Sequence, residues 1–238
     1  MTLKQVFFYF LVFLTVSSCG FKDEEDYYNE ALIFQGAGEY DRAIASLDKA
    51  IARNPDYMDA YVLRGFCNAA LGNIKKSMVE YKKALALEPN NTMTLYNLAI
   101  NYGHAKEYKE AASYLTKALK SNYVEECAIT TREESLIKVV FHEEDPDKTG
   151  YEIEACKLYF LRGLSYFNSE DYELAIADFN NIARGSSYYT SAFFYLGEIY
   201  IKKGDVSKAC TYFQKAVDLG NISAQENTIK YCKELSKK

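Results

Sequence analysis

Histidine and carboxylate side chains are the groups most able to do chemistry in this chain, and they gather at one place. His142 is followed by Glu143, Glu144 and Asp145, a set that could hold a metal ion or transfer a proton. The other histidine, His104, lies far away in the sequence, and the two do not have the spacing of a helical zinc site. A solvated acidic loop therefore explains the cluster better than a metal site does.

Asp145 and Asp147 raise a second possibility, a calcium loop. They have the spacing of its first two ligands, but Cys156 stands where the loop needs a glutamate that binds with both oxygens. No nucleophile, base and orienting acid form a recognisable local arrangement anywhere in the chain. We therefore expect no enzyme, no cofactor and no metal. An enzyme or a metal sensor centred on residues 126–155 is the alternative of another class.

Composition narrows the class of protein further. The chain has 238 residues, of which 49% are hydrophobic and 26% charged, enough to bury a sizeable core. Its formal net charge is -5, which argues against nucleic acid as a partner because phosphate binding needs a basic surface. Tyrosine occurs 22 times and tryptophan not at all, which suits helices that pack through aromatic side chains.

The first eighteen residues have the layout of an export signal. Lys4 precedes an apolar run of eleven residues from Val6 to Val16, and the small residues Ser17 and Ser18 follow. The run is too short for a permanent membrane span, which needs about 20 apolar residues. The alternative is an N-terminal helix retained in a cytosolic protein, which would place phenylalanines on all its sides.

The sequence VSSC that ends this segment resembles the lipobox of bacterial lipoproteins, although leucine is commoner where Val16 stands. The resemblance implies that residues 1–18 are removed as a signal peptide and that Cys19 is acylated, for example with palmitate. Each buried CH₂ of an acyl chain adds about 0.8 kcal/mol to membrane binding, so several chains anchor a protein stably. We therefore expect a lipid-anchored protein of the bacterial cell envelope, in the outer membrane, with residues 19–23 as the linker.

Residues 22–26, a lysine followed by acids, permit two interpretations. In some Gram-negative bacteria such a sequence after the acylated cysteine directs lipoproteins to the cell surface. Asp23 also stands where the first helix needs an N-cap, and the acids after it suit the positive end of a helix dipole. The helix explains the acids by itself, so the periplasmic and surface locations both stay open.

Pro55 and Pro89 lie 34 residues apart, and small residues recur on the same spacing, with one step of 64 residues between the third and fourth members of each register. The period predicts pairs of antiparallel helices, because helices approach closely only where side chains are small. Three registers carry the pattern, and Ile182 is their single large member: Ala31, Gly65, Ala99, Gly163 and Gly197; Ala43, Ser77, Ala111, Ala175 and Ala209; Ala50, Ala84, Ala118, Ile182 and Ala216.

This pattern resembles the tetratricopeptide repeat (TPR), a helix-turn-helix unit of 34 residues. The resemblance implies an all-α fold, a superhelix or α-solenoid of about five repeats. The repeats are expected in two groups, residues 24–125 and 156–223, with the units 24–57, 58–91, 92–125, 156–189 and 190–223. Residues 224–238 are expected to form a capping helix that is amphipathic through Ile229, Cys232 and Leu235.

Residues 126–155 form a non-repeat insertion. Thr131 and Glu134 have the spacing of a capping box, which favours a short helix from Arg132 to about Phe141. The sequence SLIKVVF within it is equally compatible with a strand, and its periodicity cannot decide between the two.

Four cysteines suggest disulfides, which an exported protein permits. Cys127 and Cys156 bracket the insertion and could join its two ends, while Cys210 and Cys232 lie on a late helix and on the cap that should pack against it. Each pair is a candidate only, because cysteine is also a common small core residue.

The first helices of the repeats present a second row of residues, which we call the groove stripe. It occupies repeat positions 5, 9 and 12, about 100° from the face toward the partner helix, and in TPR proteins it lines the concave groove. Its apolar members are the candidate partner-binding residues: Tyr28, Leu32, Val62, Phe66, Tyr96, Ile100, Phe160, Leu164, Phe167, Phe194 and Ile201. The alternative is that these side chains pack against neighbouring helices or are covered by the insertion.

Together these features predict a non-enzymatic, membrane-anchored scaffold that binds a protein or peptide through an apolar groove. Such a scaffold suits an accessory subunit of an envelope assembly or pilus machine. A surface-exposed lipoprotein adaptor in nutrient capture is the alternative.

Overall fold

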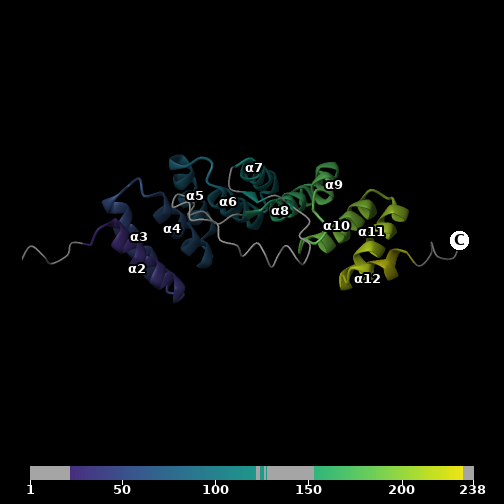
Figure 1. The fold of residues 1–238 in the computed structure, drawn as a ribbon, viewed down its shortest axis with the longest axis horizontal. Coiled ribbons are helices and arrows are strands. Elements are labelled where there is room, and N and C mark those ends of the chain that lie inside the picture. The colour runs from purple at the N-terminus through teal and green to yellow at the C-terminus, as the bar shows by residue number, and fades with distance from the viewer. Residues whose placement is uncertain (1–21, 122–123, 126, 128–152, 233–238) are drawn as a thin grey trace, which may run out of the picture. The chain divides into compact units, whose positions relative to one another are not determined.

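The computed structural model describes residues 22–121, 124–125, 127 and 153–232. These residues form two compact units, which divide between Asn73 and Ile74. Figure 1 labels the elements along the chain. The signal peptide, Cys19, the helix or strand expected over 132–141 and the acidic cluster at His142 all lie outside the described residues. The alternative of an enzyme or metal sensor centred on the insertion therefore stays a hypothesis.

The first unit consists of α2 (Glu24–Gly36), α3 (Tyr40–Arg53) and α4 (Met58–Ala70). Asp23 caps α2 as expected: its Oδ1 accepts from the backbone N–H of Asp26 at 2.8 Å, and Asp26 accepts in return from the N–H of Asp23. This reciprocal capping satisfies two backbone donors that would otherwise lack a helical partner. The acids that follow Lys22 are thus part of a helix start.

The core of the first unit is built around three alanines. Ala31, Ala43 and Ala50 are completely buried together with Leu47, so α2 and α3 pack closely through side chains of one carbon. Cys67 of α4 is also buried in this cluster, and burial raises the pKa of its thiol to about 11. This cysteine is therefore a core residue and not a reactive thiolate.

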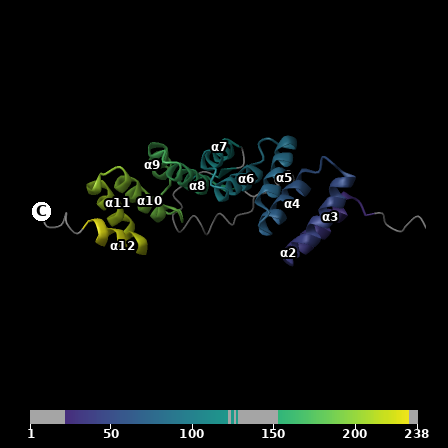
Figure 2. The same cartoon turned by 180° about the vertical axis from the view of Figure 1, so that it is seen from behind.

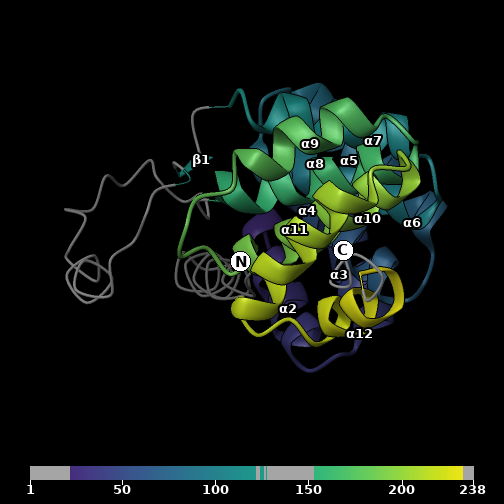
Figure 3. The ribbon, with the colours of Figure 1, turned by 90° about the vertical axis from the view of Figure 1, so that its right-hand side faces the viewer.

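The second unit contains eight helices and one short strand pair among the residues that the structure describes. Its elements are α5 (Ile74–Leu87), α6 (Thr92–His104), α7 (Tyr108–Ala118), β1 (Val124–Glu125), β2 (Ile153–Glu154), α8 (Ala155–Asn168), α9 (Tyr172–Asn180), α10 (Tyr189–Lys202), α11 (Val206–Asp218) and α12 (Ile222–Tyr231) (Figure 2). Consecutive helices from α5 to α12 pack against each other. Figure 3 shows the ribbon with α11 and α12 toward the viewer. The all-α prediction is thus correct apart from the strands, which pair in parallel for two residues.

Close packing in the second unit depends on two glycines. A Cβ added to Gly197 would lie 2.4 Å from a ring carbon of Phe213, and one added to Gly163 would lie 2.7 Å from Phe179. Where the repeat instead has alanine at this place, as at Ala99, the facing side chain is the smaller Leu115. The two positions therefore vary together in size, so that each helix pair is filled without overlap.

One turn position has left-handed backbone in every repeat. Gly38, Gly72 and Gly204 occupy it with φ between 75° and 78°, as expected for a residue without a Cβ. Lys106 and Glu170 occupy the same position with φ of 61° and 64°, where a side chain costs conformational energy.

The capping helix differs from its prediction. It packs through Ala224, which is completely buried, and through Cys232, whereas Ile229 is 51% exposed. The expected apolar face through Ile229 was wrong, because α12 turns its buried side toward α11 about Ala224. Leu235, the third expected member, lies outside the described residues.

Candidate functional site

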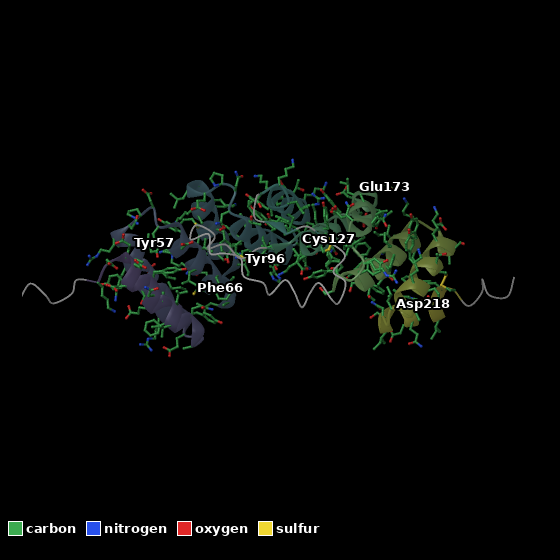
Figure 4. The ribbon with its side chains drawn as sticks, in the orientation of Figure 1. Tyr57, Phe66, Tyr96, Cys127, Glu173 and Asp218 are labelled. Carbon is green, nitrogen blue, oxygen red and sulfur yellow. A yellow bond between two sulfur atoms is a disulfide. The ribbon has the colours of Figure 1, made fainter. Side chains whose placement is uncertain are left out.

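The groove stripe of the first unit is partly open. Leu32 and Phe66 are each 40% exposed. Tyr28 packs against Tyr57, with ring centroids 5.2 Å apart, and Phe66 meets the edge of Tyr40 at 6.3 Å (Figure 4 labels Tyr57 and Phe66). Val62 is partly exposed as well. The aromatic members of this part of the stripe thus lie against neighbouring helices and still reach solvent.

The part of the stripe on α10 is used mainly for internal packing. Phe194 contacts the ring of Phe213 at a centroid distance of 6.1 Å, and Ile201 packs in the cluster that includes Tyr231 and Cys232. These two side chains were predicted to bind a partner, but in the structure they pack against other residues of the chain.

Between α8 and α10 a single tyrosine fills the space along the stripe. The ring centroid of Tyr195 lies 5.9 Å from that of Phe160 and 5.5 Å from that of Phe167, both of them stripe residues on α8. Tyr195 also stacks on Phe179, so it belongs to the core of this helix group. Between α8 and α10 the stripe thus packs against a neighbouring helix, which is the alternative to partner binding that the sequence left open.

Between α6 and α8 the stripe opens into a pocket with a volume of about 290 Å³. Ile100 and Leu164 line it, so the structure brings these two predicted site residues together across two helices. The other lining residues come from α6, α7 and α8: Ala99, Gly103, His104, Tyr108, Leu115, Leu161, Ser165 and Asn168. The lining is mostly apolar, and its polar members are His104, Tyr108, Ser165 and Asn168.

Two residues that are smaller than their counterparts in the next helix interval account for the pocket. Gly103 holds the repeat position that Phe167 holds on α8, and a Cβ added there would have no atom within 4 Å. Leu161 likewise stands where α10 has Tyr195. The side chains that close the next interval along the array are thus missing here.

Two polar side chains of the lining already have hydrogen-bond partners. Ser165 Oγ donates to the carbonyl of Leu161 at 2.9 Å, and the amide of Asn168 donates to the carbonyl of Leu164 at 2.8 Å. Neither group is a buried polar atom without a partner, so binding here would come from apolar burial.

Lys157 is a residue near the pocket that sequence reasoning missed. Its ammonium lies 4.6 Å from the ring centroid of Tyr96 (labelled in Figure 4), and a hydrogen bond to Tyr96 raises its pKa. Lys157 stands at repeat position 2, outside the positions used to define the stripe. The apolar pattern that defined the stripe therefore could not indicate this lysine.

A buried ion pair fixes α8 behind the pocket. The guanidinium of Arg162 contacts both carboxylate oxygens of Asp178, at 2.8 and 2.6 Å, and donates to Thr116 Oγ1 of α7 at 3.0 Å. Burial raises the pKa of Asp178, and the Arg162 charge acts in the opposite direction. One side chain thereby links α7, α8 and α9.

The predicted cysteine pairs lie together. Cys127 and Cys156 form a disulfide with Cα atoms 4.9 Å apart, and Cys210 and Cys232 form another at 5.7 Å. Cys127 Sγ also accepts from the backbone N–H of Ala183, which connects the start of the insertion to the segment after α9.

Within the described ranges, no three His, Cys, Asp or Glu side chains are grouped so that they could hold a metal ion. In the same ranges, no helix is long and apolar enough to cross a membrane.

Comparison with known proteins agrees with this architecture. Three family models, each described as a tetratricopeptide repeat, match residues 28–92, 157–183 and 190–221 and together cover about half of the chain. Human tetratricopeptide repeat protein 13 is 24% identical over 206 residues, which is 83% of this chain and 20% of that protein. The bovine protein SGT1 homolog is 33% identical over 95 residues, 40% of this chain. The matched segment spans only about a quarter, 27%, of that relative's length.

Solved structures share the fold at low identity. The structure of YrrB, described as a TPR protein with an unusual peptide-binding site, superposes with a TM-score of 0.67. It is 21% identical, and the match covers 87% of this chain and 92% of YrrB. PilF of Pseudomonas aeruginosa is 19% identical with a TM-score of 0.59, covering 90% of this chain and 84% of PilF. PilW, described as a type IV pilus biogenesis factor, is 18% identical with a TM-score of 0.57, covering 90% and 86%.

Proposed function

Since this chain belongs to the tetratricopeptide repeat family, whose members bind other proteins, we propose that it is a non-enzymatic scaffold whose partner docks in the α6–α8 pocket. The observation that carries the proposal is the opening between Ile100 and Leu164. An apolar side chain of a partner would bury itself there and gain about 25 cal/mol for each Å² of apolar surface removed from water.

The neighbouring helix interval explains why the partner would bind here and not along the whole stripe. Tyr195 already occupies the space beside Phe160 and Phe167, and Phe213 covers part of Phe194. At the α6–α8 interval the equivalent side chains are Gly103 and Leu161, so the apolar surface has no internal cover in the described residues.

We further propose that the scaffold works at the bacterial outer membrane, anchored through acylated Cys19, as part of an envelope assembly or pilus machine. The support is the VSSC sequence after an export-type apolar run. PilW and PilF share the fold of this chain, and PilW is a pilus biogenesis factor. The acids after Cys19 cap α2, so they give the surface-adaptor alternative no independent support.

The experiment that tests the pocket fills it with side chains the chain already uses elsewhere. The double variant Gly103→Phe, Leu161→Tyr copies Phe167 and Tyr195 into the open interval. Cross-linking in cells followed by mass spectrometry should show the wild-type partner lost in this variant.

A control adds an aromatic ring outside the pocket lining, at the half-exposed Leu174 of α9, as Leu174→Phe. This control should keep the partner. An unchanged set of cross-linked proteins in the pocket variant, with α-helical content retained, would reject the pocket.

The anchor is tested separately. Cys19→Ser should abolish incorporation of radiolabelled palmitate and move the protein from the membrane to the soluble fraction. Protease added to intact cells then distinguishes the two faces, since loss of the anchored protein indicates the surface and survival indicates the periplasm. Palmitate labelling of Cys19→Ser equal to wild type would contradict the anchor.

A further inference from the structure

Among the described residues, the one free cysteine precedes all four paired cysteines. The disulfides join Cys127 to Cys156 and Cys210 to Cys232, and Cys67 remains a thiol. An exported chain emerges from its N-terminus, so Cys67 reaches the oxidising compartment first. Pairing in the order of arrival would join Cys67 to Cys127 and Cys156 to Cys210, and neither native disulfide would form. The native pairing therefore requires that Cys67 is passed over.

Cys67 lies in a core that is complete before the next cysteine is reached. It is completely buried, and the residues buried with it, together with the half-buried side chains that pack on them, all lie between Tyr27 and Cys67. The first unit ends at Asn73, and neither disulfide includes a residue of it. The core that hides Cys67 therefore contains no residue that follows it in the chain and depends on no oxidation.

Burial withholds Cys67 from thiol–disulfide exchange in two ways. Exchange begins when a thiolate contacts a disulfide sulfur of another protein, and a side chain without exposed surface makes no such contact. Burial also raises the pKa of the Cys67 thiol to about 11, so only about one molecule in ten thousand carries the reactive thiolate at pH 7. Once the first unit has folded, Cys67 is thus out of reach of the exchange reaction.

We infer that the first unit folds before Cys127 is oxidised and hides Cys67, so that oxidation in the order of arrival forms both native disulfides without isomerisation. With Cys67 hidden, Cys127 and Cys156 are the first two thiols to arrive, and Cys210 and Cys232 are the next two. The inference rests on the proposed envelope location, in which acylation also removes the Cys19 sulfur from pairing.

The oxidant of this reaction is a thiol–disulfide oxidoreductase of the envelope that carries a disulfide. A thiolate of the chain attacks that disulfide and forms a mixed disulfide, and a second thiolate of the chain then displaces the oxidoreductase. The chain loses two S–H bonds and gains one S–S bond in each round. The oxidoreductase takes up the two electrons and two protons and leaves as a dithiol.

The test opens the core of one unit at a time. Leu47→Asp places a charge in the core around Cys67, and Leu98→Asp places the same charge in the second unit; both leucines are completely buried in the wild type. Expression of the full chain is induced briefly in bacteria, free thiols are blocked with N-ethylmaleimide at intervals, and disulfide-linked peptides are quantified by mass spectrometry.

The two variants should differ in their pairing. Wild type and Leu98→Asp should pass from thiols to the native disulfides with Cys67 in no disulfide at any time. Leu47→Asp should instead join Cys67 to Cys127, and Leu47→Asp, Cys67→Ala should recover the native pairs because the competing thiol is gone. In wild-type samples in which Cys127 is still reduced, Cys67 should react with the maleimide at least about tenfold more slowly than Cys127.

Three results would overturn the order of folding. One is an early Cys67–Cys127 disulfide in wild type that later gives way to the native pairs, because isomerisation would then correct the pairing. Another is equal reaction of Cys67 and Cys127 with maleimide in wild type before oxidation. The third is native pairing in Leu47→Asp while its Cys67 reacts with maleimide.

A different result would overturn the proposed location itself. If Cys127 and Cys210 of the wild type remain reduced in cells at all times, the chain does not reach an oxidising compartment, and the envelope location and the inference both fail. Loss of the α6–α8 docking claim in its own cross-linking test would leave the inference standing, since no residue of that pocket takes part in the pairing.

Discussion

Replacing Gly197 by alanine tests the packing principle of the fold most sharply. The added Cβ would lie 2.4, 2.5 and 3.0 Å from three carbons of the Phe213 ring, whose rigid plane is completely buried and cannot turn aside. Overpacking of this kind costs about 1–3 kcal/mol, while the better helix propensity of alanine returns about 1 kcal/mol. Because three ring carbons lie this close to the added Cβ, the overpacking cost falls in the upper part of its range, about 2–3 kcal/mol, and we expect a net loss of about 1–2 kcal/mol in the free energy of unfolding.

The repeats themselves provide the rescue. Ala99 and Leu115 form the equivalent pair in another repeat, so Gly197→Ala, Phe213→Leu should restore a fitted interface. Phe213→Leu alone leaves a cavity and should destabilise by about 1–2 kcal/mol. The two changes should therefore be strongly non-additive, with the double variant more stable than the sum of the single variants by at least about 1 kcal/mol.

Urea unfolding followed by circular dichroism, on chains beginning at Gly20, measures these free energies. Gly103→Ala is the matched control, since its Cβ meets open space and the change should stabilise α6 by about 0.5–1 kcal/mol. Wild-type stability of Gly197→Ala, or additive effects in the double variant, would refute the reasoning.

Three further changes test other parts of the structure. Glu170→Gly should raise the free energy of unfolding by about 1 kcal/mol because it removes a side chain from left-handed backbone, while Gly204→Ala at the equivalent turn should lower it by a similar amount in urea unfolding. Asp178→Ala should cost about 3–5 kcal/mol by leaving Arg162 buried without its partner, whereas Arg162→Leu, Asp178→Leu should recover much of this loss in the same assay. Hydrogen bonds from Lys22 and Ser46 lower the pKa of Glu30. The ionised Glu30 therefore stabilises the fold above the ordinary glutamate pKa, and this stabilisation is lost as the pH falls through the lowered value. Thermal unfolding between pH 3 and 7 should show that Glu30→Gln loses less stability in acid than the wild type does.

The sequence indicates the helix pairs well because their cause is local and repeated. Small side chains at one spacing permit close approach, and the members of all three registers, from Ala31 to Ala216, are buried in the structure. The N-cap at Asp23 is equally local, since it depends only on a side chain and the backbone three residues later. Such features follow from neighbours in the chain.

The site is harder to predict because it depends on what the next helix supplies. Phe160 and Leu164 both belong to the groove stripe of α8, yet Tyr195 covers the first and a pocket opens beside the second. Lys157 was missed for the same reason, since its significance comes from Tyr96 on another helix. The left-handed turn at Glu170 likewise follows from the repeat geometry and contradicts the usual preference for glycine.

Docking of a protein partner at the α6–α8 pocket is the central claim. Site-specific photocrosslinking tests it most directly, with benzoylphenylalanine placed at His104 on the pocket rim and, as control, at Leu174 on α9. We predict one discrete adduct from position 104 that is absent from position 174 and disappears when Gly103→Phe is added. An adduct of equal yield from both positions, or one from position 104 that survives Gly103→Phe, would contradict it.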